Sequence, residues 1–170
     1  REDGSGLTDY IEIDDDNVLD VGTGDFSVSC WFYMHSQIGG ESHYLFRKGG
    51  AGAEGYAGRV TGGGSISCNI DDNIEPNLWT DSSSGVISVG KWYHVVFSWD
   101  RSDKVYCYLN GEEITSGDFP DTITGNSDTL DNGHGFYIGA NSTSAGGFRG
   151  TVTEVALFKT VAILIKTAGS

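Results

Sequence analysis

The stretch FSVSCWFYM at residues 26–34 decides the fold, because apolar and polar side chains alternate along it. A period of two is typical of a β-strand that places one of its faces on a hydrophobic core. The predicted inward face consists of Phe26, Val28, Cys30, Phe32 and Met34, and the outward face of Ser27, Ser29, Trp31 and Tyr33.

Shorter strand-like runs recur along the rest of the chain, and no segment carries a long helical stripe. Residues 100–103 lie between two of these runs and predict the turn of a hairpin. Residues 117–133 are rich in Asp, Thr, Ser and Asn and predict a long surface loop. This pattern predicts an all-β fold, a two-sheet antiparallel β-sandwich, in a single domain over residues 1–170. The runs are residues 9–13, 43–48, 56–60, 65–70, 92–99, 104–109, 135–139 and 148–158.

Charge and hydropathy limit the partners. The chain has 170 residues and a net charge of -14, from 24 Asp and Glu against 10 Lys and Arg. Such an acidic surface repels the phosphates of nucleic acids and anionic lipids. The apolar stretch at residues 161–165 is far too short to cross a bilayer. We therefore expect neither nucleic-acid binding nor membrane insertion.

The chain has three cysteines, Cys30, Cys68 and Cys107, and an odd number cannot be fully paired within one chain. Their spacing is not that of a zinc site. Cys30 and Cys107 lie inside strand-like runs, which favours buried free thiols that pack as small apolar residues. Free thiols fit assembly in a reducing compartment better than a disulfide-rich secretory route.

Several motifs occur in an order that carries a family resemblance. The most specific is Trp92-Tyr93-His94-Val95, and it is accompanied by FSVSCW at 26–31, Tyr108-Leu109-Asn110-Gly111 and the closing run 148–155. On these residues the chain resembles the laminin-G-like members of the concanavalin A-like superfamily over nearly its whole length. The resemblance implies a jelly roll of two packed antiparallel sheets. It does not fix the function, because this fold hosts lectins, receptor modules, hydrolases and virion proteins.

The resemblance also implies a structural Ca²⁺ site, where the opening Asp-Gly of the family meets its closing Asp-Glu pair. Asp3 and Glu154 match two of these positions, and the first and last strands are expected to pair there. Thr153 replaces the usual Asp and offers only a neutral hydroxyl, so the site is expected to be weak or lost. The acidic runs at residues 14–16 and 71–72 are alternative clusters, although such runs more often form solvated turns.

Sugar binding requires an exposed aromatic ring beside polar side chains. Trp79 lies in a polar segment between Asn77 and Asp81 and is the first candidate platform, and Tyr56 in a glycine-rich stretch is the second. The alternative for Trp79 is a packing role at the edge of the sandwich, since Trp is usually largely buried. Three further tryptophans lie on regular strands and are predicted to be core residues: Trp31, Trp92 and Trp99.

Catalysis is disfavoured by the residues that are missing. Laminarinase-type hydrolases of the superfamily carry the motif Glu-x-Asp-x-x-Glu, which supplies paired carboxylates. The nearest match, at residues 12–17, lacks the second Glu and runs into a turn. No serine lies in a nucleophile-elbow context, and the four histidines are predicted to be structural. We therefore expect no enzyme, with glycoside hydrolase as the least favoured function.

Two classes of function remain. The first is a non-catalytic module that binds a glycan or a surface protein in adhesion, at an extracellular or virion surface. The second is a structural or decoration subunit of a phage capsid, tail or fibre, with capsid or fibre proteins or further copies of itself as partners. The resemblance favours the first. The free thiols, the polar opening without a secretion signal, the acidity and the apolar tail favour the second.

Overall fold

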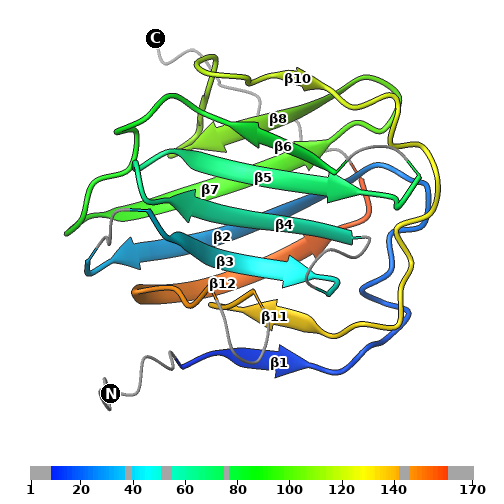
Figure 1. Cartoon of the computed structure of the whole chain (residues 1–170), viewed down its shortest axis with the longest axis horizontal. Coiled ribbons are helices and arrows are strands. Elements are labelled where there is room, and N and C mark those ends of the chain that lie inside the picture. Colours follow the sequence, from blue (N-terminus) through cyan, green and yellow to red (C-terminus); the bar gives the residue numbers. More distant parts are fainter. Residues whose placement is uncertain (1–8, 37–39, 51–54, 75–76, 142–145, 161–170) are drawn as a thin grey trace, which may run out of the picture.

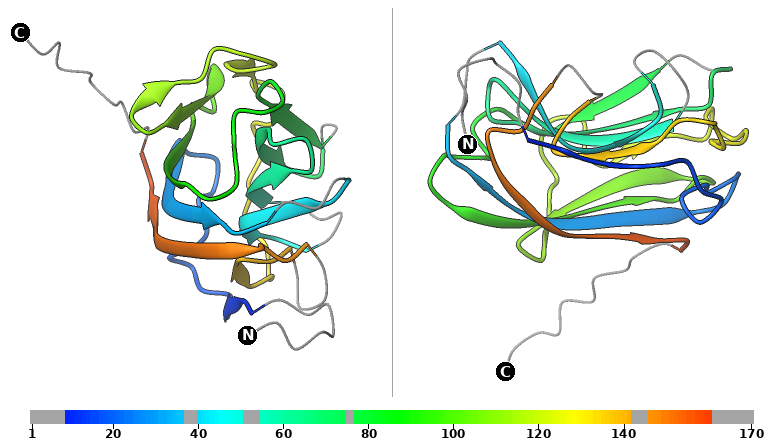
Figure 2. Two further views of the ribbon diagram at one scale, coloured as in Figure 1. Left: turned by 90° about the vertical axis from the view of Figure 1, so that its left-hand side faces the viewer. Right: turned by 90° about the horizontal axis from the view of Figure 1, so that it is seen from below.

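The computed structural model describes residues 9–36, 40–50, 55–74, 77–141 and 146–160. Two antiparallel sheets of six strands each pack face to face (Figures 1 and 2). The described residues contain no helix, and so none that is long and apolar enough to span a membrane. The predicted two-sheet antiparallel β-sandwich is confirmed.

Sheet A faces the viewer in Figure 1, and sheet B lies behind it. In spatial order, sheet A contains β1 (Ile11–Ile13), β11 (Phe136–Ile138), β3 (Ser42–Lys48), β4 (Gly55–Thr61), β5 (Ile66–Asp71) and β6 (Leu78–Asp81). Sheet B contains β10 (Asp121–Thr122), β8 (Lys104–Leu109), β7 (Trp92–Trp99), β2 (Phe26–Met34) and β12 (Gly150–Phe158), and β9 (Glu112–Glu113) pairs with β8.

Most strands follow the predicted runs, with three exceptions and one wrong pairing. The β7–β8 hairpin forms at the predicted turn, where the backbone N–H of Asp103 donates to the carbonyl of Asp100. Strands β6, β9 and β10 were not predicted, and β10 lies inside the predicted long loop. The first and last described strands do not pair, because β1 extends sheet A beside β11 whereas β12 aligns with β2 in sheet B.

The core lies between the sheets and is largely aromatic. Phe26 and Trp99 stack with ring centroids 4.5 Å apart, and Phe97 packs against Trp99 at 5.8 Å. Trp99 and Phe97 are fully buried, which confirms them as core residues. Burying a large apolar side chain of this kind stabilises the fold by roughly 1.5–3 kcal/mol.

The three cysteines are free and buried in this core, as predicted. Burial raises the pKa of Cys30 to about 12 and also raises the pKa of Cys68 and Cys107, because a thiolate is poorly solvated there. The reactive thiolate form is therefore rare in the folded protein, and these residues act as small apolar packing groups.

Candidate ligand-binding surfaces

Three of the four predicted sugar-binding residues come together on the outer face of sheet A. Trp79 on β6 lies opposite Asn69 of β5, on the side of the sheet away from the core. Asp81 lies on the same side of β6, two residues further along. The Nδ2 of Asn69 donates to the Oδ1 of Asn77 at 2.5 Å, so Asn77 is held beside Trp79. The predicted grouping of Trp79, Asn77 and Asp81 is thus a single surface.

The ring of Trp79 is not an open platform, however. The guanidinium carbon of Arg59, from β4, lies 3.4 Å from the centroid of the indole. Tyr44 stands edge-on to the same ring, with centroids 6.1 Å apart and an interplanar angle of 82°. One face of Trp79 is therefore covered by a cation, and the side chain is only half-exposed.

Tyr56 was predicted as an exposed platform, and that prediction is wrong. Only 1% of Tyr56 is exposed, because it faces inward from β4 and packs 4.8 Å from the ring of Phe26. Its hydroxyl donates to the carbonyl of Leu19 at 3.0 Å, and burial raises its pKa. The glycine-rich stretch before it leads into a strand, so the alternation of that strand places the ring in the core.

The outer face of sheet B carries the most exposed tryptophans of the described residues. Trp31 on β2 is 39% exposed and Trp92 on β7 is 50% exposed. Each belongs to a cross-strand aromatic pair: Trp31 lies 5.1 Å from His94, and Trp92 lies 5.5 Å from Tyr33. The prediction that Trp31 and Trp92 are core residues is therefore wrong, because both occupy outward positions of their strands.

A signal for this surface was present in the sequence. Within FSVSCWFYM, Trp31 and Tyr33 occupy the same strand face as Ser27 and Ser29, which is the face turned away from the core. Large rings on the polar face of an amphipathic strand indicate an exposed aromatic surface, and this signal outweighs the general tendency of Trp to be buried.

The groups around these rings are short and polar. On β12, Thr153 lies opposite Trp31, and Thr151 lies opposite Tyr33. Partial burial lowers the pKa of His94, an effect opposed by the nearby charge of Glu154, so the neutral imidazole predominates at pH 7. We call these six residues, Trp31, Tyr33, Trp92, His94, Thr151 and Thr153, the sheet B aromatic surface.

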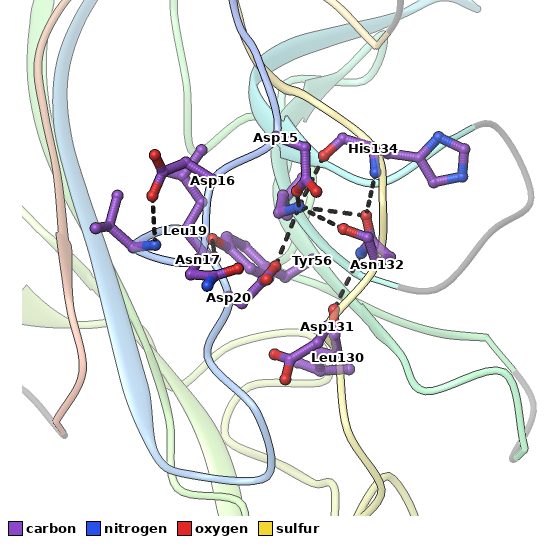
Figure 3. A network of polar contacts seen from close by, with 12 residues as sticks. Asp15, Asp16, Asn17, Leu19, Asp20, Tyr56, Leu130, Asp131, Asn132 and His134 are labelled. Carbon is purple, nitrogen blue, oxygen red and sulfur yellow. Dashed lines mark hydrogen bonds and ion pairs between the residues drawn. The ribbon is translucent and has the colours of Figure 1, made fainter.

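In the acidic run at residues 14–16, Asp15 and Asp16 are engaged within the protein (Figure 3). The ammonium of Lys48, which is fully buried, donates to the Oδ1 of Asp15 at 2.6 Å and to the carbonyls of Asn132 at 2.9 Å and His134 at 2.7 Å. The Oδ1 of Asp20 forms an ion pair with the same nitrogen at 3.2 Å. A lysine ammonium thus occupies the position in this oxygen cluster that a bound cation would take.

The second acidic run, at residues 71–72, forms a turn. The Oδ1 of Asp71 accepts the backbone N–H of Asn73, and Asp72 accepts those of Ile74 and Asp128. Across the described ranges, no three His, Cys, Asp or Glu side chains are grouped as a metal site. Glu154 is exposed at a bulge of β12 with a φ of 53°, whereas Asp3 lies outside the described residues.

A family model described as the concanavalin A-like lectin/glucanases superfamily matches residues 3–162. The chain belongs to this superfamily. A search of curated protein sequences finds no match to this laminin-G-like chain.

Solved structures of binding domains share its fold. The binding domain of Paraclostridial Mosquitocidal Protein 1 superposes with a TM-score of 0.71 at 14% identity, over 91% of this chain and 38% of that domain. The receptor-binding domain of botulinum neurotoxin C/D mosaic serotype gives 0.67 at 16% identity, over 92% of this chain and 39% of its own. The CBM40 of Ruminococcus gnavus IT-sialidase gives 0.65 at 13%, over 92% of this chain and 90% of that module. These likenesses establish the shared fold.

Two further features of this concanavalin A-like domain bear on activity. Glu12, the first residue of the hydrolase-like match, accepts a hydrogen bond from the hydroxyl of Tyr137 at 2.8 Å on the exposed edge of sheet A. A small open cleft of about 240 Å³ lies between the edges of the two sheets, where Tyr10 and Ile138 face Phe148 and Val152. Its volume is below the range of about 300–1,000 Å³ usual for pockets that enclose a small molecule.

Proposed function

We propose that this chain is a non-catalytic glycan-binding module that serves adhesion at an extracellular or virion surface, and that the sheet B aromatic surface holds the sugar. The observation that carries this proposal is the pair of exposed tryptophans, Trp31 and Trp92, on adjacent strands of the outer face of sheet B. The solved neighbours support it, because they are named as a carbohydrate-binding module and as toxin binding domains.

The geometry suits a sugar chain laid across the sheet. The C–H faces of a pyranose stack on aromatic rings, whereas the hydroxyls around its rim require hydrogen-bond partners. Trp31 and Trp92 offer two rings to one oligosaccharide. The hydroxyls of Thr151 and Thr153 and the neutral imidazole of His94 lie beside those rings and supply polar partners.

The alternative, a structural subunit of a particle, is favoured by the same observation. An exposed aromatic surface also suits packing against a second copy of the chain or against a capsid or fibre protein. A size measurement by light scattering over a hundredfold range of concentration separates the two functions. A monomer throughout supports the binding module, and a concentration-dependent oligomer that Trp92→Ala dissociates supports the structural subunit.

The direct test is a glycan array, followed by calorimetry on the neutral glycan that binds best. Trp31→Ala and Trp92→Ala should each weaken binding about tenfold, since one aromatic contact contributes on the order of 1 kcal/mol beyond its area. Tyr10→Ala is the matched control, because it removes an exposed aromatic ring that lies outside sheet B, and it should leave the affinity unchanged. Binding that persists in the Trp31→Ala, Trp92→Ala double variant would overturn the assignment of this surface.

The non-catalytic part of the proposal has its own test. Laminarin, agar and carrageenan should release no reducing sugar when they are incubated with the protein. Release at a rate that Glu12→Gln abolishes would instead identify a hydrolase that uses the carboxylate on β1.

A further inference from the structure

Three of the described basic side chains are satisfied by the protein itself. Lys48 donates to Asp15 and to two carbonyls. Arg47 donates to the carbonyls of Gly49 and Gly50. Arg101 donates to the carbonyls of Asn126 and Asp128. These cations hold the fold together and have few donors left for a ligand.

Arg59 differs from them in its contacts. Its Nε donates to the Oγ of Ser67 at 3.3 Å, and its guanidinium carbon lies 3.4 Å above the centroid of Trp79 and 6.0 Å from that of Tyr44. Among the described residues, no carboxylate forms an ion pair with Arg59 and no acceptor bonds its Nη1 or Nη2. In a chain with 24 Asp and Glu, this half-exposed cation keeps two nitrogens available.

The contacts of Arg59 also fix the orientation of its fork. A guanidinium that lies 3.4 Å from an indole centroid and is also held at Nε has lost much of its rotational freedom before a ligand arrives. The two terminal nitrogens of such a fork match the paired oxygens of a carboxylate or a sulfate, which Arg binds in a bidentate manner. Beside Trp79, Asn77 accepts from Asn69 through Oδ1, so its Nδ2 is left as a neutral donor.

We infer that Arg59, stacked on Trp79 beside Tyr44, forms a second binding site on the outer face of sheet A, and that this site takes the carboxylate or sulfate group of an acidic sugar. The site lies on the sheet opposite the aromatic surface proposed above, so its existence does not depend on that surface.

The net charge of -14 shapes how this site behaves. Long-range repulsion opposes the approach of a polyanion, so binding depends on the local fork rather than on a basic field. Added salt weakens the Arg–anion contact but also screens that repulsion, so the two effects partly cancel. The affinity for an acidic oligosaccharide should therefore change little with ionic strength, unlike binding to a basic patch, which weakens steeply as salt rises.

The test is calorimetry and NMR titration of the whole chain with three matched probes: an alginate oligosaccharide for carboxylate, a carrageenan oligosaccharide for sulfate, and a neutral agarose oligosaccharide. At least one acidic probe should bind tenfold or more tightly than the neutral one and shift the Arg59 Nε–H resonance. The probe that does so identifies the anionic group. Equal binding of all three probes would overturn the inference.

Variants separate this site from a general charge effect and from the sheet B surface. Arg59→Gln should remove the preference for the acidic probe, and Arg59→Lys, which keeps the charge but loses the fork, should lose most of it. Arg149→Gln removes the same charge from another half-exposed arginine and should leave the preference intact. The Trp31→Ala, Trp92→Ala double variant should also keep it, so the two sites can fail separately. A preference for the acidic over the neutral probe that survives in both Arg59 variants would refute the site. NMR titration of the wild type tests the site even if a variant does not fold.

Discussion

The outer faces of the two sheets follow the same alternation of inward and outward side chains, but they differ in how far their tryptophan rings are exposed. On sheet A, Trp79 is covered by Arg59, which reaches it from β4 across the short side chains of β5. On sheet B, the neighbours of Trp31 across the strands are His94 and Thr153, and the ring stays 39% exposed. The exposure of an outward ring is thus decided by the reach of the side chains on neighbouring strands.

The largest effect on the free energy of unfolding is expected on β7, which places one tryptophan in the core and another on the outer face of sheet B. Trp99 and Trp92 lie at opposite ends of β7, but Trp99 is fully buried and Trp92 is half-exposed. Trp99→Ala should lower the free energy of unfolding by about 3–5 kcal/mol, as truncation of a buried aromatic residue does. Trp92→Ala should cost about 1 kcal/mol, since it loses mainly its contact with Tyr33. Urea unfolding measures both, and a loss below ~1 kcal/mol for Trp99→Ala would mean that the hairpin is wrongly placed.

The second prediction concerns the polar interior at the end of sheet A. Lys48→Met keeps a similar volume but leaves Asp15, Asp20 and two carbonyls without their cation. Removing one partner of a buried pair costs about 3–5 kcal/mol, and the partial exposure of Asp15 places this case near 3 kcal/mol. The matched control is Lys91→Met at an exposed position, which should change the unfolding free energy by less than ~0.5 kcal/mol. Equal losses in the two variants would show that the network does not stabilise the fold.

The sequence predicts the inward-facing residues of a strand better than the surroundings of its outward-facing residues. The alternation in FSVSCWFYM identifies the five inward residues of β2, all of which are fully buried. It also separates Trp31 and Tyr33 from them, but it cannot show whether a neighbouring strand covers an outward ring. Trp31 and Trp92 were therefore misassigned to the core. For Trp79 the sequence left an exposed platform and edge packing as alternatives, and it did not predict the contact with Arg59.

Long-range polar contacts are the part that the sequence did not predict. Lys48 meets Asp15, which is 33 residues away, and Asn132, which is 84 residues away, so no local pattern joins them. Arg59 and Trp79 come together only because β4 and β6 flank β5. Motif order identifies the family and the two-sheet fold because these depend on local alternation, whereas the sites depend on which strands become neighbours.

Calcium should change the free energy of unfolding less than Trp99→Ala or Lys48→Met does. A structural Ca²⁺ ion at Asp3 and Glu154 stays a proposal, because Asp3 lies outside the described residues. At a free Ca²⁺ concentration ten times the dissociation constant, binding would add about 1.4 kcal/mol to the stability. Thermal melting in EDTA and in millimolar Ca²⁺ measures this for the wild type and for Asp3→Asn. An unchanged melting temperature of the wild type would refute an intrinsic site, and a shift that survives Asp3→Asn would place the ion elsewhere.

The smallest predicted effect is the response of the sheet B aromatic surface to acid. Partial burial lowers the pKa of His94 below that of the unfolded chain, which is about 6.5. Above that pH both states are neutral and His94 contributes no pH dependence. As the pH falls below it, the unfolded state binds the proton more readily, so the folded state loses stability. The melting temperature of the wild type should therefore fall more between pH 7.5 and pH 5.5 than that of His94→Gln.

The same experiment bears on the comparison of the two faces, because a protonated His94 would place a cation 5.1 Å from the ring of Trp31. That arrangement would make the sheet B surface resemble the Arg59–Trp79 arrangement of sheet A, and acid should then weaken the binding of a neutral sugar while leaving the sheet A site unchanged. A steeper loss of stability on acidification in His94→Gln than in wild type would show that folding raises the pKa of His94 instead of lowering it. It would mean that the charge of Glu154 outweighs the burial of the imidazole, and that His94 is protonated at a higher pH than an unfolded histidine.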